Sequence, residues 1–126
     1  MTDNNPISHV FTKNHRLLTP CDFKRVFDTP AKKIHSEHLL LFVRAGQIKQ
    51  MCPRLGLAIT KKKLRQAVMR NRLKRLTREY FRLHCSGMEA VDVVLIVKKK
   101  YTKDIDLHGE LTQIFKKLIA DYPAKS

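Results

Sequence analysis

Residues 55–97 decide the fold, and they read LGLAITKKKLRQAVMRNRLKRLTREYFRLHCSGMEAVDVVLIV. The runs 55–60 and 90–97 are short and apolar, which is typical of buried β-strands. Between them, apolar side chains recur at helical spacing on one side of a predicted amphipathic helix: Met69, Leu73, Leu76, Tyr80 and Leu83. The three elements form a βαβ unit, whose two strands run parallel because the chain crosses back over the sheet between them.

The other side of this helix is strongly basic. In residues 70–82, RNRLKRLTREYFR, six of the thirteen residues are Arg or Lys and one, Glu79, is acidic. Like charges four residues apart, such as Arg70 and Lys74, cost a helix about 0.2–0.5 kcal/mol per pair. A charged run taken alone is usually a solvated face, but this one lacks acidic partners. Nucleic-acid phosphates would supply them, because Arg binds phosphate bidentately and counterion release drives association.

Two lysine triplets extend the basic surface. Residues 61–63 follow the first strand of the unit, and residues 98–100 follow the second. Because the two strands are expected to run parallel, both triplets should emerge at the same edge of the sheet. The basic helix begins at that edge, with the positive end of its dipole.

The whole chain has the same charge imbalance. Its 126 residues include 26 Lys or Arg and 11 Asp or Glu, a formal net charge of +15 at pH 7, which favours polyanionic partners. A hydrophobic content of 43% supports one globular domain. We expect a flexible basic arm over residues 1–15, a single RNA-binding domain over 16–122 and a short tail over 123–126.

Cysteine usage and hydropathy indicate a compartment. The cysteines at positions 21, 52 and 85 are odd in number and include no C-x-x-C pair, which favours free thiols in a reducing cytosol. No apolar run approaches the roughly 18 residues of a membrane span, and the N-terminus lacks the features of a signal peptide. We therefore expect a soluble, cytoplasmic protein.

Three further elements are predicted outside the βαβ unit. A short helix should begin at Pro20, with Thr19 as its N-cap, and end before Pro30. Residues 39–44 are predicted as a strand, and the turn region after it would make it an antiparallel neighbour of 55–60. A final helix should follow the second lysine triplet.

That final helix is predicted over residues 107–121 from apolar side chains at helical spacing, with Asp106 as its N-cap. Together, the elements indicate the α+β class. The expected architecture is a single-domain α/β sandwich, with a mixed sheet of about four strands and three helices.

Aromatic side chains lie near the basic segments and could stack on unpaired bases. Phe23 and Phe27 are one helical turn apart, Phe42 lies on a strand, and Tyr101 follows the second lysine triplet. However, two Phe side chains that flank Val26 on a short helix are more often plain core. Both interpretations of these rings stay open at this point.

Catalytic motifs are scarce in the sequence. Two-metal nucleases need clustered carboxylates, yet the close pair Asp104 and Asp106 lies where a helix cap is expected. The six histidines form no metal-binding motif, and no phosphate-binding Gly-rich loop occurs. A stand-alone nuclease is therefore disfavoured. The lack of helix-turn-helix and zinc-finger signatures favours RNA over DNA as the partner.

The segment AVMRNRLKRLTREYFR, preceded by GLAITKKK, resembles the signature of the bacterial ribonuclease P protein component. The segments HRLLTPCDFKRVF and DVVLIVKK extend the resemblance over roughly residues 14–119. It implies the non-catalytic protein subunit of a ribonucleoprotein that removes the 5′ leader from precursor tRNA. In that family the RNA is the catalyst and holds most of the Mg²⁺, so no catalytic or metal-binding side chain is expected. The resemblance also implies a left-handed βαβ crossover, against the general right-handed preference.

The resemblance assigns two groups of RNA-contacting residues. The group expected to bind the catalytic RNA lies on the basic helix: Arg70, Asn71, Arg72, Lys74, Arg75 and Arg78. The group expected to bind the single-stranded leader has three aromatic and five basic members: Phe23, Phe27, Phe42, Arg16, Lys61, Lys62, Lys63 and Arg65. The implied partners are ribonuclease P RNA and precursor tRNA, without a membrane or an obligate protein partner. The alternative is a ribosomal or general binder of structured RNA with a similar fold.

Overall fold

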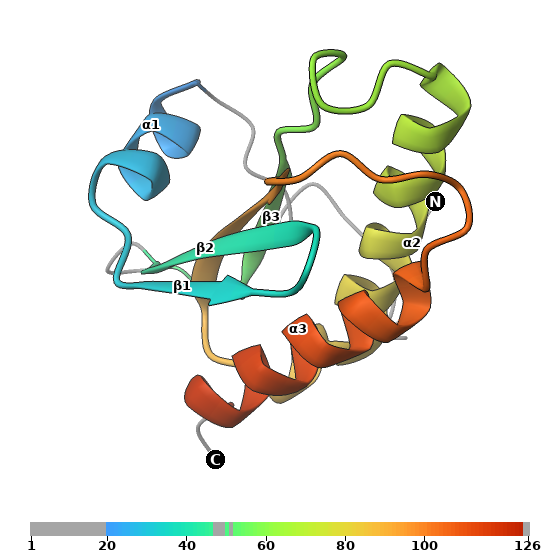
Figure 1. Cartoon of the computed structure of the whole chain (residues 1–126). Coiled ribbons are helices and arrows are strands. Elements are labelled where there is room, and N and C mark those ends of the chain that lie inside the picture. The colour runs from blue at the N-terminus through green and yellow to red at the C-terminus, as the bar shows by residue number, and fades with distance from the viewer. Residues whose placement is uncertain (1–19, 47–49, 51, 125–126) are drawn as a thin grey trace, which may run out of the picture.

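Helices cover both faces of one four-stranded mixed sheet (Figure 1). The computed structural model describes residues 20–46, 50 and 52–124. In chain order the elements are α1 (Pro20–Asp28), β1 (Lys32–His35), β2 (Leu39–Ala45), β3 (Arg54–Leu57), α2 (Ala67–His84), the 3₁₀ turn η2 (Cys85–Gly87), β4 (Val91–Val97) and α3 (Leu107–Asp121). The predicted α+β architecture is confirmed. The predicted arm over residues 1–15 and the Thr19 cap lie outside the described residues.

The strands are ordered β1-β2-β4-β3 across the sheet. β3 and β4 pair in parallel, as the βαβ prediction requires, and β4 also pairs antiparallel with β2. The prediction that 39–44 and 55–60 are antiparallel neighbours is wrong, because β4 lies between them. β4 is buried at every position except Ile96, so it gains most from a central place with partners on both sides. The handedness of the crossover stays a prediction.

The larger core lies between the sheet and helices α2 and α3, which pack side by side on one face (Figure 1). Alternate residues of the central strands face it, as Leu41 and Leu95 do. The predicted final helix is confirmed, and its apolar stripe is buried: Leu107, Leu111, Ile114, Phe115 and Leu118. The predicted cap is also confirmed, because the Asp106 carboxylate accepts a hydrogen bond of 3.0 Å from the backbone N–H of Gly109.

The buried face of α2 differs from the predicted one. Its fully buried residues are Leu73, Thr77 and Phe81, spaced four apart, whereas Leu83 is 53% exposed. The other three residues of the predicted face are only partly buried: Met69, Leu76 and Tyr80. Thr77 can be buried because its hydroxyl donates to the carbonyl of Leu73 at 2.7 Å. Apolar spacing alone therefore predicts the position of the helix in the sequence correctly. The buried face that it predicts is rotated slightly from the observed one.

Helix α1 covers the opposite face of the sheet, over a smaller cluster (Figure 1). Val26 of α1 and Val94 of β4 are fully buried there, packed among four partly buried residues: Phe23, Phe42, Ala58 and Ile96. This apolar contact is small, and a second interaction also holds α1 on the sheet. It is made by four charged side chains.

These four side chains, which we call the ionic anchor, are Asp22, Arg25, Arg54 and Asp92. Arg54 donates to both oxygens of the Asp92 carboxylate, from Nε at 3.0 Å and from Nη2 at 2.9 Å. Arg25 bridges Asp22 at 3.0 Å and Asp92 at 3.3 Å. Asp92 is fully buried, and Gln50 donates to it at 2.8 Å. Bidentate pairing of this kind fixes both distance and orientation, so α1 is held over β3 and β4.

The chain stays in contact with the domain past the end of α3. Pro123 forms an isolated β-bridge with Met88, and the backbone N–H of Ala124 donates to the carbonyl of Gly87 at 3.1 Å. All three cysteines are free thiols, and Cys85 is buried. Among the helices of the described residues, none has the length and apolar character needed to cross a membrane.

Candidate nucleic-acid interface

The outer face of α2 presents a group of cations. Asn71, Arg72, Arg75 and Arg78 are exposed and Lys74 is half-buried. Within the part of the chain that the structure describes, no Asp or Glu oxygen lies within 4 Å of the charged group of Arg72, Lys74, Arg75 or Arg78. Arg82 differs, because it pairs with Glu79 one turn away. The predicted group thus shares a cationic surface that is open to a polyanion.

Arg70 belongs to this group by sequence but has a further contact. Its Nη1 donates to the backbone carbonyls of Leu64 at 2.7 Å and Arg65 at 2.8 Å. The side chain therefore ties the loop before α2 to the first turn of the helix. Residues 61–65, which carry four of the predicted leader-binding cations, take their position partly from this contact.

The N-terminus of α2 is poor in caps. Gln66 is the N-cap residue, but its side chain makes no capping hydrogen bond, and the first turn holds no acid. Helix N-termini carry unsatisfied N–H groups and partial positive charge, which attract phosphate. This end of the helix adds to the basic surface instead of neutralising it.

The two lysine triplets meet at one edge of the sheet, as predicted. β3 and β4 run parallel and end together, and the Lys63 ammonium donates to the backbone carbonyl of Lys98 at 3.4 Å. All six lysines of 61–63 and 98–100 are exposed. Their charges therefore surround the start of α2 and are free to contact phosphate.

The three predicted aromatic residues lie together between α1 and β2. Phe23 and Phe27 have ring centroids 6.4 Å apart, and Phe27 meets Phe42 edge to face at 5.1 Å. The Lys33 ammonium lies 5.5 Å from the centre of the Phe42 ring, within cation–π range. Phe27 is 36% exposed, whereas Phe23 and Phe42 are half-buried in the smaller cluster. The rings therefore combine a core role with an accessible edge.

The aromatic rings and the lysine triplets are neighbours along the sheet. Ala58 and Ile96 pack in the same small cluster as the rings, and they precede the first lysine of each triplet by three and two residues. Of the other predicted leader contacts, Arg65 is exposed, and Arg16 lies outside the described residues. A single-stranded nucleic acid could thus contact the rings and the cations together, without a large gap between the two groups.

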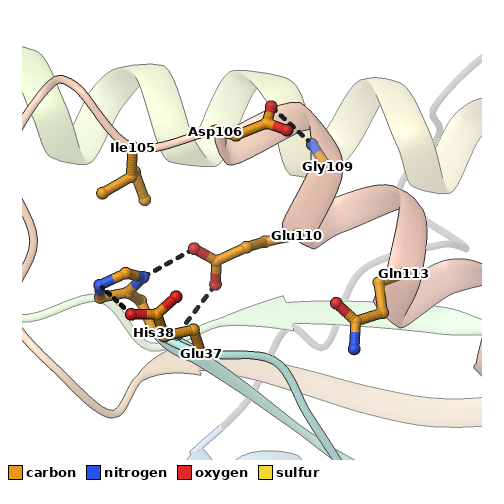
Figure 2. A pocket seen from close by; sticks show the side chains of 7 residues that line it. All are labelled: Glu37, His38, Ile105, Asp106, Gly109, Glu110 and Gln113. Atoms are coloured by element: carbon orange, nitrogen blue, oxygen red, sulfur yellow. Dashed lines mark hydrogen bonds and ion pairs between the residues drawn. The ribbon is translucent and has the colours of Figure 1, made fainter.

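The carboxylates near α3 are engaged in the fold. Glu110 accepts a hydrogen bond from the Ser36 hydroxyl at 2.6 Å. It also accepts one from the backbone N–H of His38 at 2.9 Å, and its other oxygen lies 2.7 Å from His38 Nδ1 (Figure 2). Burial alone would raise the pKa of Glu110, but these hydrogen bonds outweigh it and lower the pKa below its ordinary value. We call these contacts of Glu110 with Ser36 and His38 the Glu110 clamp. The clamp joins α3 to the turn between β1 and β2.

An open hollow beside this clamp, about 610 Å³, is lined by Glu37, Asp106 and Gln113 among others (Figure 2). Asp106 is used as a helix cap, and Glu110 is used by the clamp. Over the described ranges 20–46, 50 and 52–124, no three His, Cys, Asp or Glu side chains gather in a way that could hold a metal ion. Asp106 and Glu110 therefore pair with groups of the same chain.

Sequence reasoning missed the ionic anchor. In the sequence Asp22 is only an acid near the start of a predicted helix, yet in the fold it is buried and accepts from Arg25 and Arg54. A signal was present in Asp92, a lone acid within an otherwise apolar strand. A charge at such a position must find partners, but local spacing does not name them.

Comparisons with known proteins agree with this geometry. Residues 11–119 match the family described as Ribonuclease P. The chain is 46% identical over 112 residues to the ribonuclease P protein component of Pseudomonas fluorescens strain Pf0-1, covering 89% of this chain and 81% of the relative. It is 38% identical over 120 residues to that of Pseudomonas entomophila strain L48, covering 94% and 89%.

Solved structures share the fold. The RNase P protein from Staphylococcus aureus superposes with a TM-score of 0.70 at 27% identity, covering 93% of this chain and 97% of that one. The RNase P protein from Thermotoga maritima gives 0.67 at 27% identity, covering 83% and 96%. The similarity spans nearly all of the described domain.

Proposed function

The chain belongs to the bacterial ribonuclease P protein family, and we propose that it binds the RNA of that enzyme through the outer face of α2. It is the protein component of an endoribonuclease, and its partner is ribonuclease P RNA. One observation carries the assignment of this surface. The α2 cations at positions 72, 74, 75 and 78 have no acidic partner among the described residues, unlike Arg82, so they repel one another until phosphates neutralise them.

The substrate contact of the proposal is the single-stranded 5′ leader of precursor tRNA. The exposed edge of Phe27, next to Phe23 and Phe42, offers a surface on which unpaired bases stack. The lysine triplets at the adjacent sheet edge would hold the leader phosphates. Rings and cations in one continuous surface suit a single strand better than a duplex, whose bases are already stacked.

The Mg²⁺ ions of the reaction are proposed to be held mainly by the RNA. Several carboxylates of the described chain are already engaged: Asp22 and Asp92 with arginines, Asp106 as a cap, and Glu110 with Ser36 and His38. These side chains do not fit a magnesium site, which takes carboxylates with open positions. The chain would thus lend cations and a docking surface in the cytoplasm, while bond cleavage takes place on the RNA.

Reconstitution tests the proposal. The purified chain alone should leave precursor tRNA intact, and it should raise the cleavage rate of its cognate RNA at low Mg²⁺. The holoenzyme should also bind precursor tRNA more tightly than mature tRNA. Equal rates with and without the chain would contradict the proposal, and equal affinities for the two tRNAs would indicate a general binder of structured RNA.

A further inference from the structure

A pocket between the start of α2 and the segment before α3 has no role in the function proposed above. Its volume is about 180 Å³, and its walls are largely apolar, formed by Val68, Met69, Ile105 and Leu107. The ring of Tyr101 also lines it. We call this cavity the Val68 pocket.

The pocket has an exposed apolar edge among cations. Val68 is 77% exposed, although its neighbours Asn71, Arg72 and Arg75 on the outer face of α2 are polar or basic. Arg72 and Lys103 also line the pocket. A second hollow, of about 310 Å³, adjoins it through the shared residues Val68 and Arg72 and continues to Asn71 and Arg75. The apolar walls of the pocket therefore adjoin a surface lined by basic side chains.

The walls are well supported. The Tyr101 ring contacts the His38 ring edge to face, with centroids 5.7 Å apart, and His38 is held by the Glu110 clamp. Burial raises the pKa of Tyr101 to about 12, so the ring stays neutral. Leu107 is buried in the first turn of α3. The pocket is therefore formed before any ligand arrives, which lowers the entropic cost of binding.

We propose that the Val68 pocket receives one unpaired nucleobase of ribonuclease P RNA, while the flanking phosphates lie at Arg72, Arg75 and Lys103. This inference rests on the proposed function of α2. The volume lies below the roughly 300–1,000 Å³ of drug-sized ligand sites, so one ring system fits and a longer segment does not. Unpaired RNA bases are held by such combinations of aromatic ring, apolar wall and guanidinium plane.

Charge favours RNA over a protein occupant. A second copy of the chain would bring another net charge of +15 to a rim that is already basic, and like charges at an interface oppose association. An apolar peptide would leave Arg72 and Lys103 unneutralised. RNA supplies the base for the walls and the anions for the rim in one molecule.

Two variants test the pocket without changing charge. Val68→Ser removes the exposed apolar wall, and Thr102→Trp fills the cavity from an exposed position. Leu83→Ser is the matched control, because Leu83 is an exposed apolar residue at the other end of α2. Each full-length variant is titrated with the cognate RNA at several salt concentrations, and thermal melts verify that its fold is intact.

Both pocket variants should weaken RNA binding about fivefold or more, the low end of what one stacked base contributes, and Leu83→Ser should not. The salt dependence should stay the same, because no phosphate contact is lost. Reactivity of the RNA bases toward a modifying reagent should show one unpaired nucleotide that the wild-type chain protects and both variants leave open. Unchanged affinity and protection would overturn the proposal, as would a concentration-dependent dimer that Val68→Ser abolishes.

An Arg75→Ala, Arg78→Ala double variant separates this inference from the function on which it rests. If the double variant loses RNA affinity while the pocket variants do not, the α2 surface binds RNA and the pocket inference fails alone. If neither set of variants loses affinity, the proposed RNA-binding face itself is wrong.

Discussion

Two groups of arginines in this chain meet opposite surroundings. Arg25 and Arg54 reach inward to Asp22 and Asp92, and Asp92 is fully buried. Arg72, Arg75 and Arg78 stand on the outer face of α2, with no carboxylate within 4 Å in the described residues. Arginine thus has two uses in this chain. One group connects elements of the fold, and the other stays accessible to a ligand.

The difference shows how the chain can be both compact and strongly charged. Acids such as Asp22, Asp92 and Glu110 are placed where they hold the fold, so their negative charge is not available to neutralise α2. Buried pairs contribute orientation more than net stability, and here they orient the helix that carries Phe23 and Phe27. Changing either group of arginines should therefore affect one property and spare the other.

The largest effect is expected for the ionic anchor. Asp92→Ala leaves Arg25 and Arg54 without their shared carboxylate, and removing one partner of a buried pair costs about 3–5 kcal/mol. The free energy of unfolding from denaturant titration measures this loss. Asp104→Ala, at an exposed aspartate, should change it by less than about 0.5 kcal/mol. Similar values for the two variants would show that the anchor contributes nothing.

The double variant Arg75→Ala, Arg78→Ala should have the reverse effect. Its stability should stay the same or rise slightly, because like-charge repulsion along α2 is relieved. Binding to the cognate RNA should weaken by about 2–3 kcal/mol, and the salt slope should fall by about 2 because two phosphate contacts are lost. Lys116→Ala, on the exposed side of α3, serves as control. An unchanged slope would contradict the phosphate assignment.

Phe27→Ala should weaken holoenzyme binding of precursor tRNA, relative to mature tRNA, by about 1–2 kcal/mol, as expected for one stacked base. Phe27→Leu is the informative control, because it keeps apolar volume against Phe23 and Phe42 but removes the aromatic face. If both variants lose the preference equally, packing explains the effect and base stacking does not.

The smallest effect concerns Glu110. Its pKa is lowered in the folded chain, so its contribution to stability is present above the ordinary value of about 4.3 and is lost as the pH falls through the lower folded value. Glu110→Gln should cost about 1 kcal/mol at neutral pH. Below pH about 4.3 its stability should fall less steeply than that of the wild type. Parallel curves of unfolding free energy against pH would contradict the clamp.

The βαβ unit could be predicted from sequence because each part has its own period. Apolar runs marked 55–60 and 90–97, and parallel pairing then placed both lysine triplets at one edge. The order of the strands could not be predicted in this way, since it depends on which strand gains most from two neighbours. β1 was missed because only Ile34 of its four residues is buried.

Part of the candidate site was also beyond local reasoning. The outward position of Arg72, Arg75 and Arg78 follows from helical geometry. The ionic anchor and the Val68 pocket join residues from distant parts of the chain, so no spacing in the sequence reveals them. Arg70 lies on the predicted face, yet its contacts with Leu64 and Arg65 depend on a loop conformation that only the folded chain shows.

That arginine links two surfaces mechanically. Both of its loop contacts come from Nη1, and a guanidinium carries further N–H donors in a rigid plane. The Arg70 side chain can therefore donate hydrogen bonds to the loop carbonyls and to an RNA oxygen at the same time. The position of the lysines at 61–63 would then depend on how the catalytic RNA binds to α2.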